Sequence, residues 1–490
     1  MITLQARLHS CVRWLSILSL LALAGCAGTR TVDEKSATLL LQSSDYPAYA
    51  SRFLDSQGKP KYDPSSLLDS LEAGKAFNDA GLWQFSSEAF EAAGKLLHWK
   101  EDTVDTPAEV ASLIGTTLTS DAFGPYQGKI HQGSLIDYYQ AINMLMLGRE
   151  SDARVDFNRL QVRQDNALTQ LSAYAATVKQ SVGEGMRHEQ GGSARQSLAG
   201  IGPQVAQGVQ DLPAGTNQAK IRHAAGDLMS ALFRATSSAQ SDKRSNLSRD
   251  MLRQASQASA TRGGNALIAH SGRQISAGRG ALKNHVIVLY EDGVGPGYDE
   301  FRIDLPLFIV TGKVSYTGIA LPRFRPGQGA FGGLRIEGGK QPAETVVLTN
   351  LNELAGLEFD AAYRGIVTKA VLSTVIKTAA QVAINHQIDR EAGNSLVGSL
   401  LKIGVGAAQY ALTQADTRSW VNLPNTIQMA LLERPASGKL RIATMASAPL
   451  IDVELPEAGN VLVLVKAAGA QAPPAIYVQA LPTEVPATKI

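Results

Sequence analysis

The chain has 490 residues, of which 44% are hydrophobic and 18% are charged, and its 46 basic and 44 acidic side chains leave a formal net charge of +2. A nearly neutral chain has no general electrostatic attraction to nucleic acid or anionic lipid, so nothing in its net charge points to such a partner. Only two cysteines are present, Cys11 and Cys26, which excludes a disulfide-rich scaffold.

The first 26 residues have the pattern of an export signal. Arg7 and Arg13 precede an apolar run, Trp14 to Ala24, which is too short to span a bilayer as a stable helix. The run ends on Leu-Ala-Gly-Cys at 23–26, which resembles the bacterial lipobox. This resemblance implies that residues 1–25 are a signal peptide and that lipid is attached to the sulfur of Cys26.

Cleavage at this point would leave a mature chain with one cysteine, itself lipidated, and with 44 basic and 44 acidic side chains. We therefore expect no intramolecular disulfide and no thiolate metal site. Ala27, and not aspartate, follows the cysteine, and in lipoproteins this implies sorting to the outer membrane, facing the periplasm. Residues 26–60 are polar and rich in Ser, Asp and Pro, so we interpret them as a tether with short ordered pieces.

Residues 61–165 have helical periodicity and an internal repeat. The segments around Gly81 and Gly148 align on these glycines, with small residues (Gly74, Ala141) seven positions earlier and phenylalanines (Phe90, Phe157) nine positions later. Small residues where two helices touch, a glycine in the turn and an aromatic in the second helix are typical of tetratricopeptide repeats. The glycines lie 67 residues apart, about twice the usual period of roughly 34 residues. The alternative is two unrelated helical hairpins.

Residues 166–283 consist largely of Ala, Gln, Ser, Gly and Arg, and Phe233 is the one aromatic between Tyr174 and Tyr290. Too few large side chains are present for a thick core, so we expect thinly packed helices and mobile loops. Asp227 to Ala258 retains near-helical spacing of apolar residues and predicts a third helical pair.

Residues 284–480 predict a β-rich domain. From His285 the sequence alternates, contains β-branched and aromatic residues, and breaks at Gly-Pro-Gly, which predicts a hairpin. Further strands follow, interrupted by helical spacing over 358–414, which predicts a helical hairpin inserted into a β-sandwich-like domain. Residues 481–490 are interpreted as a tail. The predicted fold class is thus α+β, with N-terminal tetratricopeptide-like helical repeats preceding this domain.

The sequence contains no strong motif for catalysis, metal binding or cofactor binding. The loop Gly327–Gly332 fits GxGxxG but opens onto a predicted strand, so it lacks the helix N-terminus that holds a pyrophosphate. No GxSxG or HExxH sequence occurs, and we predict no catalytic residue, metal site or cofactor. The histidines of the mature chain are scattered: His98, His131, His188, His223, His270, His285 and His386.

Three other features of the sequence bear on structure and function. The acids Glu291, Asp292, Asp299, Glu300 and Asp304 flank the Gly-Pro-Gly turn, and we interpret them as solvated acids rather than a cation site. Asp416 to Trp420 is expected to cap a helix and to dock Trp420 on the sheet. The apolar segment from Ser395 to Leu412 just reaches the length of a membrane span, but three glycines favour a core helix.

The chain resembles a group of uncharacterised bacterial lipoproteins with tetratricopeptide-like repeats. The resemblance rests on the lipobox, on YYQAINMLMLGRESDARVDFNR, on VIVLYEDGVGPGYDEFRIDLPL and on ADTRSWVNLP. It implies no enzymatic activity. We therefore expect a non-enzymatic protein-binding or scaffold lipoprotein of the bacterial envelope, with a peptide or partner helix in the groove of the repeats, a membrane contact through Cys26 and no nucleic-acid partner.

Two alternatives remain open. An envelope hydrolase would use residues brought together only by folding, and a serine or acid within hydrogen-bonding reach of a histidine in a cleft would favour it. A lipid- or pore-associated protein would use the predicted hairpin over 366–412, and an exposed apolar hairpin would favour that function.

Overall fold

The computed structural model describes residues 38–97, 125–185, 187, 198–199, 201–213, 221–239, 246–259, 261–308, 314–339, 341–392, 414–457, 459–481 and 488–489. Over these residues the protein is a mixed α and β structure in which helices fill the N-terminal part and most strands come later. The predicted α+β class is confirmed at this level.

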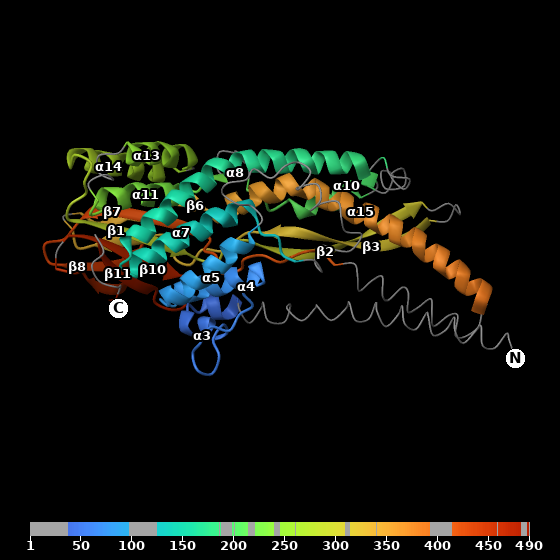
Figure 1. Ribbon diagram of the computed structural model, residues 1–490, viewed down its shortest axis with the longest axis horizontal. Helices are drawn as coiled ribbons and strands as arrows, with labels where there is room; N and C mark the ends of the chain where they lie inside the picture. The colour runs from blue at the N-terminus through green and yellow to red at the C-terminus, as the bar shows by residue number, and fades with distance from the viewer. Residues whose placement is uncertain are drawn as a thin grey trace.

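The helices of the N-terminal half form one layer. Their bounds are α3 (Tyr46–Ser51), α4 (Leu67–Asp79), α5 (Trp83–Leu96), α7 (Ile130–Met146), α8 (Glu150–Gly185), α11 (Ala224–Thr236), α13 (Leu247–Ala258) and α14 (Arg262–Ala277). Each of these helices packs on the next one along the chain. The layer therefore runs in chain order from α3 on one side of the molecule to α13 and α14 on the other (Figure 1). Two short helices, α10 (Gly202–Val205) and η3 (Ala206–Gly208), lie apart from this stack, and η3 packs on β3.

The strands form two larger sheets and a separate hairpin. One sheet has the order β12-β11-β10-β1-β7-β6 and the other has the order β5-β4-β8-β9. The strands of the six-stranded sheet are β1 (His285–Asp292), β6 (Val346–Asn350), β7 (Thr426–Glu433), β10 (Asn460–Ala467), β11 (Ala475–Leu481) and β12 (Thr488–Lys489). Those of the four-stranded sheet are β4 (Leu334–Glu337), β5 (Ala343–Glu344), β8 (Lys439–Thr444) and β9 (Pro449–Glu454).

The six-stranded sheet is the central layer. Every residue of β1 is buried. Ile287 and Leu289 belong to the core shared with the helices, whereas Val286 and Val288 belong to the core shared with the four-stranded sheet. Because successive side chains of a strand point to opposite faces, one strand serves both cores. Burial of both faces explains the nearly continuous apolar sequence of β1 and β10.

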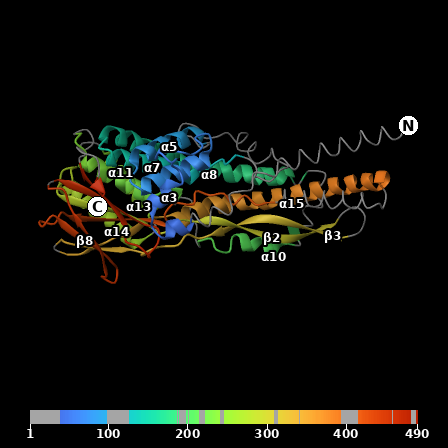
Figure 2. The same ribbon diagram turned by 90° about the horizontal axis from the view of Figure 1, so that it is seen from below.

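An extended arm leaves this body. The hairpin β2 (Gly297–Phe308) and β3 (Val314–Arg325) pairs antiparallel along its full length, and the helix α15 (Leu351–Ala392) packs on β3. Aromatic and branched side chains of β3 and α15 share a core, including Phe324 and Phe359. At 42 residues, α15 is about 63 Å long, and Figures 1 and 2 show it beside β2 and β3 as they extend from the body.

One predicted hairpin is wrong. β1 and β2 are strands as expected, but they do not pair with each other. β1 lies between β7 and β10, and β2 pairs with β3. The physical reason is that β1 is apolar on both faces and needs a neighbour on each edge within a covered sheet. The chain therefore leaves the sheet at the Gly-Pro-Gly turn, where Val294 forms a bridge to Gln328.

Several predicted boundaries also change. The described part of the expected tether, from residue 38, contains α3 and buries Leu41, Tyr46 and Tyr49, so it belongs to the folded body. α8 continues through the expected boundary at 165/166 because its apolar spacing continues to Leu171 and Val178, both buried. The inserted helix begins at Leu351 and not at 358, and residues 393–413 of the predicted hairpin lie outside the described residues.

The expected third helical pair is present as α11 and α13, which pack closely on each other. The expectation of thin packing is wrong for α11, because all 13 of its residues are buried. Its small residues allow close approach of α8, α13 and the sheet. The low aromatic content led us to expect too little burial here. Alanines and a few larger residues such as Phe233 pack closely against the neighbouring elements and are buried.

The two repeat glycines occupy turns that require a left-handed backbone. Gly81, between α4 and α5, has φ of +76°, and Gly148, between α7 and α8, has φ of +75°. A Cβ atom at Gly81 would also lie 2.6 Å from a ring carbon of Tyr477.

We expect Gly81→Ala to lower the free energy of unfolding by about 1–3 kcal/mol in urea titrations. Gly94→Ala is the matched control, because that position lies in α5 with open space around it, and it should raise stability by about 0.5–1 kcal/mol. Equal effects of the two variants would contradict this reading.

The environment of Asp156 on α8 predicts that the stability of the protein depends on pH. Burial, and then the charge of Asp137 on α7, raise the pKa of Asp156 to about 7. Because the folded chain binds this proton more tightly than the unfolded chain, the associated stability is present at low pH and is lost as the pH rises from about 4 to 7. We expect Asp156→Asn to stabilise the protein by roughly 1–3 kcal/mol at pH 8 and to have little effect at pH 4. Thermal unfolding at both pH values tests this, with Asp250→Asn, at a 47% exposed side chain on α13, as the control.

Candidate functional site

The predicted repeat residues lie inside the helix layer. The ring of Phe90 contacts the backbone at Gly74, where an added Cβ would lie 2.7 Å from two ring carbons. Ala141 and Phe157 are fully buried. These residues pack α4 on α5 and α7 on α8, so their role is architectural. Cys26, the predicted lipidation site, lies outside the described residues.

The most unusual polar feature is a buried cluster of four charged side chains. Two of them come from the central sheet. Glu291 on β1 and Lys466 on β10 are register partners on adjacent parallel strands. Both continue the alternation of residues that face the helices, following Leu289 and Leu464 respectively. A carboxylate and an ammonium group therefore lie side by side where the sheet meets the helix layer.

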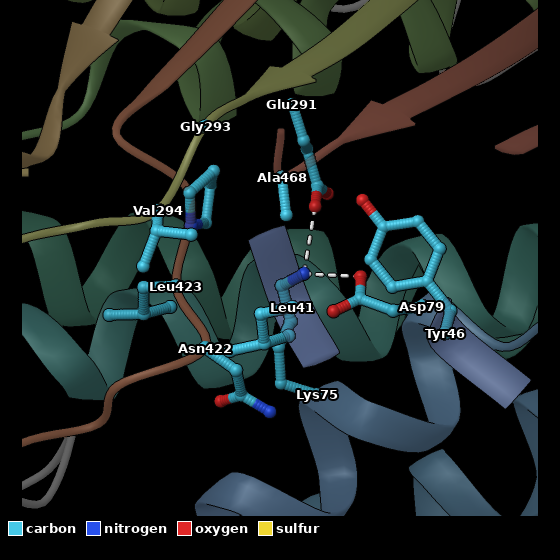
Figure 3. Close-up of a pocket in the computed structure, with 11 residues that line it drawn as sticks. Leu41, Tyr46, Lys75, Asp79, Glu291, Gly293, Val294, Asn422, Leu423 and Ala468 are labelled. Carbon is cyan, nitrogen blue, oxygen red and sulfur yellow. Dashed lines mark hydrogen bonds and ion pairs between the residues drawn. The ribbon is translucent and has the colours of Figure 1, made fainter. Parts of the chain in front are cut away.

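Helix α4 supplies the other two charges. Lys75 and Asp79 are four residues apart and so lie on one face of the helix, where they form an ion pair. Nζ of Lys75 lies 2.9 Å from Oε2 of Glu291, and Nζ of Lys466 lies 2.7 Å from Oδ1 of Asp79 and 3.4 Å from Oε2 of Glu291. Figure 3 shows Lys75 between Asp79 and Glu291. Each of the four side chains is 3% exposed or less.

In this charge cluster, burial and ion pairing shift the pKa values of the side chains in opposite directions. Burial alone would raise the pKa of Glu291, but Lys466 and Lys75 outweigh it and hold this pKa below its usual value. Burial alone would lower the pKa of Lys75, but Asp79 and Glu291 raise it above its usual value. For Lys466 burial prevails and its pKa is lowered. The cluster carries two positive and two negative charges, so it is neutral as a whole.

Neighbouring groups close the cluster. Asn78 hydrogen-bonds to Asn143 of α7, which in turn donates to Ser86 of α5. The ring of Tyr139 lies 5.1 Å from the ammonium group of Lys75. The adjoining cavity is about 10 Å³, the size of one water molecule. The cluster thus has no room for a substrate, and its geometry joins α4 to β1 and β10.

A second buried polar site lies where α7 meets α15. Glu358 of α15 accepts hydrogen bonds from the backbone N–H of Ile130 and His131, at 3.0 and 3.4 Å, and its Oε2 lies 2.9 Å from Nδ1 of His131. The carboxylate therefore binds the N-terminus of α7. Burial alone would raise the pKa of Glu358, but the His131 side chain, the charge of Lys129 and the backbone N–H of Ile130 lower it below its usual value.

The other side of His131 borders a cavity of about 20 Å³, the size of one or two water molecules. Ser419 and Trp420 line the same cavity, and neither Oγ of Ser419 nor Nε1 of Trp420 has a hydrogen-bond partner among the described residues. His131, which pairs with Glu358, and Ser419 thus line one cavity, and these are the residue types that a hydrolase would require. His131 is only 4% exposed and the cavity is smaller than an ester or peptide substrate.

The glycine loop 327–332 binds an internal anion. The N–H groups of its last three residues donate to Oδ1 of Asp292 at 3.0, 3.0 and 3.2 Å, and the hydroxyl of Tyr290 donates to the same oxygen at 2.5 Å. These backbone donors, which a phosphate loop would offer to a ligand, are used within the chain. The sequence argument against a nucleotide here is consistent with this geometry.

The interpretation of the acids beside the Gly-Pro-Gly turn is wrong for two of them. Glu291 and Asp292 are 3% and 2% exposed and not solvated, because β1 is covered on both faces. Trp420 is buried in the core that the helices share with the six-stranded sheet, with its ring 5.7 Å from that of Phe90 and 6.1 Å from that of Tyr139. Asp416 binds the Arg418 side chain at 2.8 Å, and the helix it was expected to cap lies outside the described residues.

Sequence reasoning missed both buried sites. The available signal for the charge cluster was the pair of charges that interrupts two apolar strands, Glu291 after HVIVLY and Lys466 after NVLVLV. Among the described residues, no group of histidines, cysteines and acids has the geometry of a metal site. Within the same residues, no helix has the length and apolar character of a membrane span.

No family model, curated protein or solved structure matches this chain.

Proposed function

We propose that this protein is a lipoprotein anchored through Cys26 and that it acts as a non-enzymatic protein-binding or scaffold module of the bacterial envelope, on the outer membrane facing the periplasm. The lipobox supports the anchor. The chain-order stack of helices fixed to a central sheet supports the scaffold role, because such stacks expose long continuous surfaces.

The observation that carries the proposal is the pair of stacked helical hairpins. α4 packs on α5, α7 packs on α8, and α5 packs on α7, with a left-handed glycine in each hairpin turn. We interpret these hairpins as two tetratricopeptide-like units. We likewise interpret the six- and four-stranded sheets, which share a core, as a β-sandwich-like unit.

The partner surface that we propose differs from the groove expected from the sequence. Every residue of α7 except Gln140 is buried, because α7 lies between its neighbouring helices and the central sheet. A partner would have to displace the sheet to reach the inner helices. We therefore place the partner surface on the outer face of α8, where Val155 and Val162, seven residues apart, are 47% and 46% exposed.

The experiment is site-specific photo-crosslinking in intact cells. A photoreactive amino acid at Val155 or Val162 should give one discrete adduct with an envelope protein, identified by mass spectrometry. The same amino acid at Lys95, a 71% exposed position on α5, is the matched control and should give none. No adduct at either valine, together with an empty affinity purification from crosslinked envelopes, would refute the binding role.

The anchor has its own test. Cys26→Ser should abolish metabolic labelling with a radioactive fatty acid and should release the protein from the membrane fraction. Retained acyl labelling would refute lipidation at Cys26. Retained membrane association without labelling would show that another part of the chain holds the membrane.

A hydrolase is the second candidate, and it is favoured by His131, which pairs with Glu358, lining the same cavity as Ser419. A fluorophosphonate probe, which reacts with activated serines, separates the two functions. The scaffold proposal expects no labelling of the native chain. Labelling that disappears in both Ser419→Ala and His131→Gln would replace the scaffold proposal with an enzymatic one.

A further inference from the structure

The helices α13 and α14 form the outermost pair of the helix layer. Their inner faces are apolar and buried, with Met251 and Ala255 on α13 and Ile268 and Ile275 on α14. α13 rests on α11, and α14 packs on α13. Figure 1 shows the pair on the side of the body opposite α3 and at the end opposite the extended arm.

The exposed residues of this pair, and of the segment that follows α14, are rich in cations. Six exposed cations lie between Asn246 and Asn284, four on the two helices and two after α14, and we refer to them as the arginine surface: Arg249, Arg253, Arg262, Arg273, Arg279 and Lys283. The only acid in the same span is Asp250, which pairs with Arg253 at 3.0 Å. The near-neutral net charge of the whole chain conceals this local excess.

Apart from Arg253, the cations of this surface have no carboxylate partner in the described part of the chain. Elsewhere, exposed arginines commonly have such partners, as Arg302 has Glu300 and Arg441 has Asp452. Between the cations, the exposed positions of α13 and α14 are mostly Ala, Ser, Gln, Gly and Asn. The exposed neighbours of the long basic side chains are therefore mostly small or short, although Leu247 is 45% exposed.

This chemistry fits a flat anionic surface better than a protein. Residues 246–284 contain no aromatic side chain, whereas protein interfaces depend on aromatic and apolar anchors in well-packed pockets. Binding to an anionic membrane leaflet needs only positive charge on the protein. Each basic residue near the leaflet increases the partitioning of the protein onto the membrane roughly fivefold.

We propose that the arginine surface binds an anionic phospholipid bilayer other than the one that holds the lipid anchor. The proposal rests on the proposed anchor at Cys26. Residues 27–37, which join the anchor to the described chain, span about 40 Å at most when fully extended. The described chain starts beside α3, so the point where the tether joins the body and the helices α13 and α14 lie on opposite sides of the helix layer (Figure 1).

The test uses the full chain reconstituted into phosphatidylcholine vesicles. These are mixed with labelled vesicles containing 30% phosphatidylglycerol, and the recruitment of label is measured by flotation. We expect recruitment at low salt, its loss in 0.5 M salt, and none with labelled phosphatidylcholine vesicles. Replacing Arg249, Arg253, Arg262 and Arg273 by glutamine should weaken recruitment at least about tenfold.

The matched control removes four exposed cations elsewhere, by replacing Lys59, Lys61, Lys95 and Lys439 with glutamine, and should recruit as the native chain does. Equal loss in both variants, or no loss in either, would overturn the proposal. Inorganic polyphosphate that binds the native chain at lower concentration than the vesicles do would assign the surface to a soluble polyanion and also overturn it. If the chain does not enter the first vesicles, the anchor is refuted separately, and direct flotation of the soluble chain with the anionic vesicles tests the surface.

Discussion

Glu291→Gln is expected to lower the free energy of unfolding by about 3–5 kcal/mol, as loss of one partner from a buried ion cluster does. The glutamine keeps the shape of the side chain but removes its charge. Lys75 and Lys466 would then share one buried carboxylate, that of Asp79, and one positive charge would be left uncompensated. Chemical denaturation monitored by tryptophan fluorescence measures this effect.

Two controls separate the buried cluster from ordinary surface pairing. Glu454→Gln removes the partner of Lys439 in a pair whose side chains are 79% and 68% exposed, and it should cost at most about 1 kcal/mol. The double variant Glu291→Gln, Lys466→Met removes one charge of each sign and should recover part of the loss. A double variant that loses the sum of both single effects would contradict a charge-balance origin.

Glu358→Ala is expected to cost about 2–4 kcal/mol, because three donors lose their acceptor in a buried position. Two of these donors are backbone N–H groups in the first turn of α7, which have no partner within the helix. The substitution also loosens the contact between α7 and α15. Glu91→Ala, at a 64% exposed position on α5, is the control and should cost less than about 1 kcal/mol.

The effect of Glu358 has a defined pH window. The pKa of Glu358 is lowered in the folded protein, so its contribution is present above the unfolded pKa of about 4.5 and is lost as the pH falls through the folded value. The difference between native chain and Glu358→Ala should therefore shrink below pH 4.5. A difference that stays constant down to pH 3 would mean that packing, and not the carboxylate, holds this contact. Thermal unfolding from pH 3 to pH 7 measures it.

Local features of the protein were predictable from local patterns. Apolar spacing located α4, α5, α7 and α8, and a glycine between two helical segments marked each left-handed turn. Alternation located the strands, because a side chain's face is set by its own position in the strand. These inferences depend on residues a few positions apart, which backbone geometry places relative to one another without help from the rest of the chain.

Partners distant in sequence were decided by the tertiary structure. The two carboxylates and two ammonium groups of the charge cluster come from α4, β1 and β10, and Lys466 is 387 positions from Asp79. Because β1 is covered on both faces, Glu291 is a buried ion and not the expected surface acid. For the same reason β1 pairs within the central sheet and not with β2. Periodicity reports which face of an element is apolar, but it does not say which other element covers that face, because that choice depends on the packing of the whole core.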